Sequence, residues 1–175
     1  MKIVILNGSP RAGGNTEIMA GEFARGAQEK GHEVVQVKLA GKKIAGCLGC
    51  DFCASHDGVC VQKDDMAEIY NLLEQADLVA FASPIYWFSI TAQLKCVIDR
   101  LYAKGSVGFH FNQVVLLLDS ASEGVYEAAV AQYKAMNEYL GWKDRGMITI
   151  SGMTGKGSMW DSDRLEEVCR LGKSL

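Results

Sequence analysis

Four cysteines stand close together in the sequence with the spacing Cys47-x2-Cys50-x2-Cys53-x6-Cys60. Thiolates separated by short spacers can converge from one tight loop on the iron corners of a 4Fe-4S cluster, so this spacing predicts a metal site. The last spacer is longer than in the bacterial ferredoxin run. Zinc more often uses two separated Cys-x2-Cys pairs, and free or oxidised thiols need no metal. The cluster is the favoured interpretation, with free thiols and zinc as alternatives.

A second segment, residues 7–16, has the residue types that bind a phosphate group. Such a site needs backbone N–H groups at a helix N-terminus together with hydroxyl donors. Gly14 and its neighbouring glycines permit the turn, Ser9 and Thr16 offer hydroxyls, and Arg11 supplies positive charge. The alternative is an ordinary capped loop between a strand and a helix, since serine, asparagine and threonine also cap helices.

The type of phosphate ligand follows from what the segment lacks. A P-loop requires Gly-Lys-Ser/Thr, which does not follow here. A Rossmann dinucleotide site requires Gly-x-Gly-x-x-Gly and an acid at the end of the second strand, where this chain has Val37, Lys38 and Leu39. A mononucleotide such as FMN is the ligand that remains.

Two further segments can surround a flavin ring. The first carries Pro84, Ile85, Tyr86, Trp87 and Phe88 after a buried apolar run, and aromatic side chains with backbone N–H groups suit a flat ring. The alternative is that these aromatic side chains fill a core or a subunit interface. The second segment contributes Ser120, Ala121 and Gly124 as weaker candidates, because serine and glycine also simply form turns.

Three motifs together resemble the NADPH-dependent FMN reductase group of flavodoxin-like proteins. They are residues 9–16, which read Ser-Pro-Arg-x-x-Gly-Asn-Thr, residues 83–87, which read Ser-Pro-Ile-Tyr-Trp, and residues 92–100, which read Ala-Gln-Leu-Lys-x-x-x-Asp-Arg. The likeness covers nearly the whole chain. It implies a five-stranded flavodoxin-like sheet of order 2-1-3-4-5, with Ser9, Arg11, Asn15 and Thr16 holding the FMN phosphate.

The resemblance also implies an activity. The group reduces FMN with NAD(P)H as co-substrate and passes electrons to a flavin, a quinone or another small acceptor. Its iron–sulfur flavoproteins carry a compact four-cysteine motif and bind a 4Fe-4S cluster beside FMN. The alternative function is therefore an electron carrier that accepts electrons from ferredoxin and has no small-molecule substrate of its own. The group suggests a homodimer or homotetramer, and no catalytic side chain is required because the flavin itself accepts the hydride.

The elements that must position these segments alternate along the chain. Apolar, β-rich runs at residues 2–7, 32–39, 78–83, 113–119 and 147–150 are separated by helical patterns, which begin near residues 15, 64, 89, 123 and 161. This alternation predicts one α/β domain over residues 1–175, a three-layer α/β/α sandwich around a parallel sheet. Ligands bind at the carboxyl ends of such strands. We expect the cysteine loop, which follows the second run, to emerge at that same edge and to exchange electrons with FMN.

Composition excludes several other classes. The net charge of −3 and the absence of lysine and arginine clusters argue against a nucleic-acid surface. No apolar run is long enough to cross a membrane, and the first residues lack the separate regions of a signal peptide. We therefore expect a cytoplasmic protein whose six cysteines do not form a disulfide framework.

Overall fold

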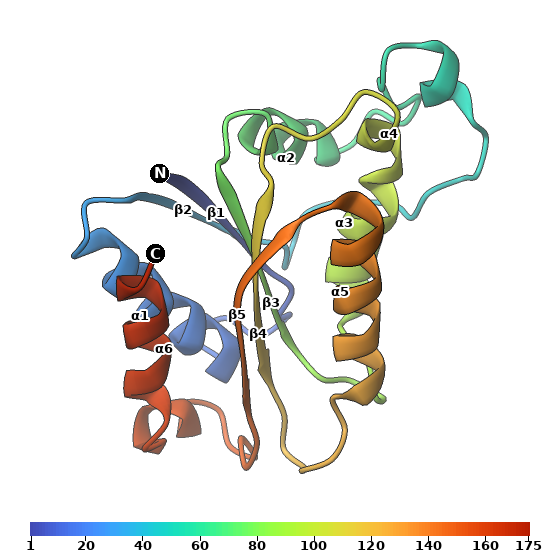
Figure 1. The fold of residues 1–175 in the computed structure, drawn as a ribbon. Coiled ribbons are helices and arrows are strands. Elements are labelled where there is room, and N and C mark those ends of the chain that lie inside the picture. Colours follow the sequence, from blue (N-terminus) through green and yellow to red (C-terminus); the bar gives the residue numbers. More distant parts are fainter.

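The computed structural model describes residues 1–175 and contains one parallel sheet of five strands in the order β2-β1-β3-β4-β5 (Figure 1). This confirms the predicted fold class and strand order. The strands are β1 (Lys2–Asn7), β2 (Glu33–Lys38), β3 (Leu78–Pro84), β4 (Gln113–Asp119) and β5 (Lys143–Ile150).

Helices cover both faces of the sheet and form a three-layer sandwich (Figure 1). Helices α1 (Asn15–Gln28) and α6 (Leu165–Lys173) pack on one face. Helices α2 (Met66–Leu73), α3 (Ala92–Arg100) and α5 (Glu127–Leu140) pack on the other, and α4 (Tyr102–Gly105) continues from the end of α3. No helix is long and apolar enough to cross a membrane.

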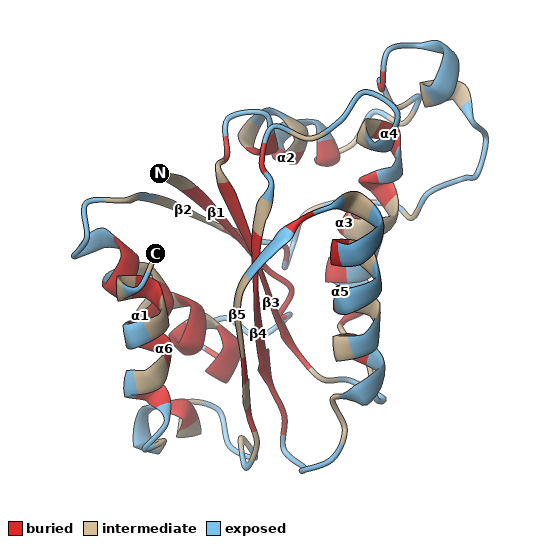
Figure 2. Cartoon of the chain, in the orientation of Figure 1, coloured by how far each residue is buried: buried red, intermediate tan, exposed pale blue.

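The central strands are continuous apolar runs because both of their faces are covered. In β1, Ile3 and Ile5 join the core under α1 and α6, whereas Val4 and Leu6 join the core under the other helices. Burial along β1, β3 and β4 is nearly complete (Figure 2). The edge strand β2 is only partly buried, as its polar alternation predicts.

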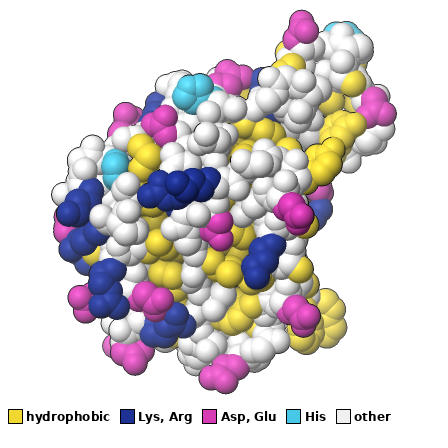
Figure 3. All heavy atoms as spheres, viewed as in Figure 1, with side chains coloured by type: hydrophobic (Ala, Val, Ile, Leu, Met, Phe, Trp, Pro, Cys, Tyr) yellow, Lys and Arg dark blue, Asp and Glu magenta, His cyan; other side chains and the backbone are white.

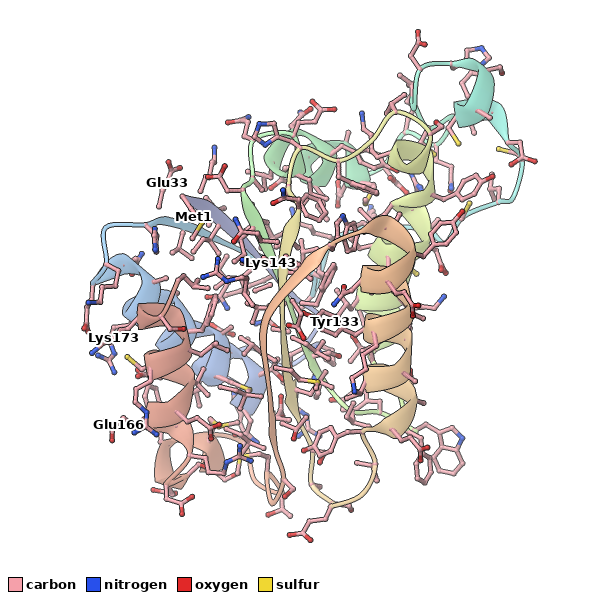
Figure 4. All side chains as sticks on the ribbon, in the orientation of Figure 1. Met1, Glu33, Tyr133, Lys143, Glu166 and Lys173 are labelled. Atoms are coloured by element: carbon pink, nitrogen blue, oxygen red, sulfur yellow. The ribbon has the colours of Figure 1, made fainter.

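Four boundaries differ from the expectation. Helix α5 begins at Glu127 rather than near residue 123, and helix α6 begins at Leu165 rather than near residue 161. Strand β5 begins at Lys143, four residues before the predicted start at 147, because its polar first half pairs with β4 through a register shift near Val114. Helix α3 begins at Ala92 rather than near residue 89, because Thr91 accepts a hydrogen bond from the Leu94 N–H and ends the preceding loop. On the same face, Tyr133 reaches from α5 to the sheet, where its hydroxyl donates to Asp144 at 2.8 Å (Figure 4).

Candidate functional site

The loop after β1 approaches the neighbouring loop so closely that only glycine fits at its first position. A Cβ on Gly8 would lie 2.7 Å from the Thr91 hydroxyl oxygen and 2.8 Å from Cβ of Leu94. Instead, the Gly8 carbonyl accepts a hydrogen bond from the Thr91 hydroxyl at 2.7 Å, and the Gly8 N–H donates to the Ala82 carbonyl. These contacts lock the predicted phosphate loop onto the sheet edge at β3 and α3.

The first turn of α1 is open to an anion. Gly14 occupies the N-cap position, and no side chain caps the helix. The Arg11 N–H donates to the Ser9 hydroxyl at 3.2 Å, so that hydroxyl lies inside the loop. Uncapped N–H groups at the positive end of a helix dipole bind negative groups. The geometry is therefore that of an anion site, with the exposed side chain of Arg11 beside it.

The structure adds a second cation that the sequence motifs do not include. Lys156 follows β5, and a Cβ on Gly13 would lie 3.6 Å from Cε of Lys156 and 3.9 Å from its Nζ. Nearby, Glu17 pairs with Lys38 at 2.6 Å and accepts from the Gly13 N–H. The hydrogen bond from Lys38 is the main cause that lowers the pKa of Glu17, and Lys156 contributes to the same shift. In the sequence, the only indication that Lys156 could lie here is its position after β5, because the carboxyl ends of parallel strands share one edge of the sheet.

Asn15, a predicted phosphate contact, has other partners in the structure. Its Nδ2 donates to the Gly155 carbonyl at 2.8 Å, and its Oδ1 accepts from the Met159 N–H at 3.1 Å. Asn15 therefore fastens the segment that carries Lys156 to the start of α1. Its direct role at a phosphate stays a prediction.

Thr16 connects the phosphate loop to a buried carboxylate. Its hydroxyl donates to Oδ1 of Asp119, which is 4% exposed at the end of β4. Burial raises the pKa of Asp119 to about 6, against the opposing effects of the Thr16 hydrogen bond and the Arg11 charge. The backbone carbonyl of Asp119 also accepts from the Ile85 N–H at 2.8 Å. The loops after β1, β3 and β4 thus meet around Asp119, which sequence reasoning did not single out.

The aromatic segment ends in a strained turn. Tyr86 and Ser89 pair across it through both of their backbone N–H groups, and the two residues between them have positive φ, +48° at Trp87 and +68° at Phe88. This conformation is unfavourable for bulky residues and marks functional segments. Trp87 is 93% exposed and Phe88 is 59% exposed, so the core does not explain these side chains. Pro84, in contrast, is buried at the end of β3, and Ile85 is half-buried.

The loop after β4 forms the third side of the predicted flavin site. Ser120 is buried, and its hydroxyl lies 2.6 Å from the Tyr126 hydroxyl and 2.5 Å from the Ser122 carbonyl. Ala121 and Gly124 are exposed, and Gly124 has a φ of +72°. The structure therefore gathers all three predicted flavin segments at one edge of the sheet.

The cysteine segment lies elsewhere, which corrects the expectation that it shares the flavin edge. In Figure 1 it projects beside α4, at the opposite end of the molecule from the loops that follow β3, β4 and β5. Tyr102 donates to Asp51 at 3.1 Å, and Gly58 packs against the Ala103 carbonyl. Helix α3 starts at the flavin edge and runs back along the sheet, so a segment that packs on α4 reaches the other end.

The four cysteines nevertheless line one cavity. Its volume is about 20 Å³, and its walls include Cys47, Cys50, Cys53, Cys60 and the buried Arg100. No three cysteine, histidine or acidic side chains are arranged as a metal-binding group. The Nε of Arg100 is buried without a hydrogen-bond partner. The four cysteines are a donor set that fits a four-thiolate centre, and the buried cation Arg100 lines the same cavity, although the thiols do not converge in the structure.

A larger cavity adjoins this segment. It measures about 420 Å³ and is mainly apolar, with Cys53, Phe109 and Trp142 among its lining residues. Tyr102 and Tyr139 are exposed at its walls. Hydrophobic side chains are also visible where the projecting segment meets the rest of the molecule (Figure 3).

A parallel sheet of this order, with an anion site after its first strand and loops gathered around it, defines the flavodoxin-like class of α/β proteins. The family model for NADPH-dependent FMN reductase matches residues 1–157, and the chain belongs to this family of FMN-dependent oxidoreductases.

Individual relatives agree with this membership. An iron-sulfur flavoprotein of Archaeoglobus fulgidus is 31% identical over 172 residues, which cover 95% of this chain and 86% of the relative. Another from the same organism is 43% identical over 105 residues, but the match spans only 47% of its length and 60% of this chain. Several other curated relatives are likewise matched over about half of their length. The solved structure of an NAD(P)H:quinone oxidoreductase from Methanothermobacter marburgensis shares the fold, with a TM-score of 0.76, 20% identity, and coverage of 99% of this chain and 94% of that one.

Proposed function

We propose that this chain binds FMN at the edge where the loops after β1, β3 and β4 meet, and that it transfers electrons from NAD(P)H to a small acceptor. The observation that carries the proposal is the uncapped N-terminus of α1 with Arg11 and Lys156 beside it. A terminal phosphate carries two negative charges near neutral pH, so it suits a helix N-terminus that has cations close by.

The side chains of this edge would hold the flavin rather than react with it. The hydrogen bonds of Thr91 to Gly8 and to Ser83 fix the spacing of the first two loops. Trp87 and Phe88 stand at the rim, where they would cover a flat ring and exclude water. Bound FMN would itself be the acceptor of the hydride or the electrons. No acid or base of the chain is therefore needed for the transfer.

Binding of two flavins tests the phosphate site. Arg11→Ala and Lys156→Gln should each raise the Kd for FMN about tenfold, because each removes a charge that faces the phosphate. The Kd for riboflavin, which lacks the phosphate, should not change. Lys143→Gln is the matched control, because Lys143 is exposed at the start of β5 (Figure 4), whereas Lys156 follows the end of that strand. Equal loss of FMN and riboflavin binding would contradict this assignment.

Steady-state kinetics separate the enzyme from the alternative. The FMN-loaded protein should oxidise NADH or NADPH in the presence of a quinone or free flavin. No turnover with either nucleotide, together with rapid reduction by ferredoxin, would instead support an electron carrier.

We also propose that Cys47, Cys50, Cys53 and Cys60 hold a 4Fe-4S cluster. Two observations support it: the four thiols share one cavity, and several relatives of this chain are iron-sulfur flavoproteins. Anaerobically purified protein should contain iron and sulfide and show a broad absorption shoulder under the flavin bands. A protein with zinc and no iron, or with no metal, would refute the cluster and leave the FMN proposal intact.

The position of the cysteine segment favours a homo-oligomer. Within one chain the cysteines and the flavin loops lie at opposite ends of the sheet (Figure 1). Contact between the cysteine end of one copy and the flavin end of another would shorten the path for electrons. The apolar cavity beside Cys53 and the exposed Tyr139 offer apolar surface for such a contact. Sedimentation should show a dimer or tetramer, and a monomer at micromolar concentration would exclude it.

A further inference from the structure

Arg100 is an unusual residue in this chain because its charge is almost completely buried. Its side chain is 1% exposed at the C-terminal end of α3. Nη1 donates to Asp64 at 2.7 Å and to the Ala45 carbonyl at 3.1 Å, and Nη2 donates to Asp64 at 3.2 Å. The Nε–H has no partner. A buried donor without an acceptor costs about 1–3 kcal/mol, and more when it belongs to a charged group.

The surroundings of Arg100 point to a negatively charged occupant of the cysteine cavity. Arg100 is the only lysine or arginine among the residues that line the cavity, and all four cysteines line it as well. Burial alone would lower the pKa of Arg100, but the hydrogen bond to Asp64 and the negative charge of Asp64 raise it above its usual value. The partly exposed carboxylate of Asp64 is the only acidic group that pairs with the buried guanidinium of Arg100. The Nε–H of that guanidinium still has no acceptor.

We propose that Arg100 is a positioning residue for the four-thiolate centre, where its charge and its free Nε–H stabilise negative charge on the sulfurs and raise the reduction potential. This inference rests on the proposed cluster and goes beyond it, because it assigns a role to a residue outside the cysteine motif. A cluster with four thiolates has a net negative charge, and a buried cation beside it offsets part of the cost of placing it there.

The sign of the effect follows from the charges. Reduction adds one electron and one unit of negative charge, and no bond is formed or broken. A neighbouring cation stabilises the reduced form more than the oxidised form, so its removal lowers the potential. Loss of the neighbouring carboxylate has the opposite effect. Arg100 and Asp64 thus provide two substitutions in one ion pair with opposite expected shifts.

The test is a redox titration of the full-length, anaerobically purified holoprotein, followed by electron paramagnetic resonance. Arg100→Gln should shift the reduction equilibrium of the cluster at least tenfold toward the oxidised form, which is about 59 mV for one electron. Asp64→Asn should shift it in the other direction, and Arg100→Lys, which keeps the charge, should shift it less than Arg100→Gln. Lys95→Gln is the matched control, because Lys95 is exposed on the same helix and also pairs with an acid, Asp99.

Each outcome decides the question. Opposite shifts in Arg100→Gln and Asp64→Asn, with no shift in Lys95→Gln, support the inference. Equal potentials in wild type and variants, or shifts in the same direction, refute it while the cluster itself stands. If Arg100→Gln does not fold, an unchanged potential in Asp64→Asn is sufficient to refute it. Absence of iron from the wild type would refute the cluster and this inference together, while FMN binding would remain measurable.

Discussion

Replacement of Asp119 by asparagine should stabilise the protein at neutral pH. The carboxyl group is 4% exposed beneath the phosphate loop, and the Thr16 hydroxyl is the side-chain donor that it accepts from. Asparagine has nearly the same shape, and its Oδ1 can accept the same hydrogen bond. The substitution therefore removes a buried charge and leaves the packing of the three loops in place.

The magnitude follows from the pKa of this group. Burial raises the pKa of Asp119 from its usual 3.8 to about 6 in the folded protein. Because the folded pKa is the higher one, the neutral carboxyl contributes its full stability below about pH 4, and this stability is lost as the pH rises through about 6. A shift of about two units corresponds to about 3 kcal/mol at pH 7. The asparagine variant should avoid that loss.

Urea unfolding of the apo-protein between pH 4 and pH 8 measures the effect. The free energy of unfolding of the variant minus that of wild type should rise by about 2.4 kcal/mol from pH 4 to pH 7, with its midpoint between the two pKa values. Asp99→Asn, which changes a partly exposed carboxylate on α3, serves as the control and should show no such rise. A difference that does not depend on pH would refute the account of Asp119 as a buried, destabilising charge.

The same charge should oppose the phosphate of FMN. Asp119 lies one hydrogen bond away from Thr16 in the loop that we assign to the phosphate. Asp119→Asn should therefore bind FMN several-fold more tightly than wild type at pH 7, and the gain should shrink near pH 5, where Asp119 is mostly protonated. Riboflavin titrations serve as the control and should show a smaller effect.

Other perturbations have equally definite outcomes. The double variant Trp87→Asn/Phe88→Gly should raise the free energy of unfolding by about 2 kcal/mol, because both positions have positive φ, and it should weaken flavin binding. No gain in stability to urea would show that the turn is not strained. Gly26→Ala should destabilise the protein by about 1–3 kcal/mol, since its Cβ would lie 2.1 Å from the Cys169 carbonyl oxygen of α6; an unchanged melting temperature would contradict this packing. Asn15→Ala should raise the Kd for FMN and lower the free energy of unfolding by about 2 kcal/mol, because it frees the segment that carries Lys156. A loss of stability with unchanged FMN affinity would limit Asn15 to a structural role.

Much of the fold could be predicted from local sequence. The strands β1, β3 and β4 are continuous apolar runs because helices cover both of their faces, and such runs are visible without any tertiary information. Strand β5 was predicted too short, since its first residues are polar and belong to the sheet only through pairing with β4. Propensity describes a residue's own preference, whereas pairing depends on a partner distant in sequence.

The candidate flavin site was predictable to the extent that its residues are contiguous. Ser9, Gly14 and Trp87 belong to short motifs at strand ends, and parallel strands bring their ends to a common edge. Lys156 and Asp119 were missed because neither belongs to a motif. Lys156 reaches the phosphate loop through the Asn15 contacts, and the carboxyl of Asp119 matters only because the surrounding loops bury it.

The cysteine segment shows most clearly what the sequence predicts and what only the tertiary structure decides. Sequence alone predicts the chemistry, because the number and spacing of the thiols limit which centres they can form. Only the tertiary structure decided where that chemistry lies and which charge accompanies it. The segment packs on α4 rather than staying at the end of β2, and Arg100 meets it there because α3 returns along the sheet to the same place. Spacing is a local property, but the position of a loop is set by the surface that buries it.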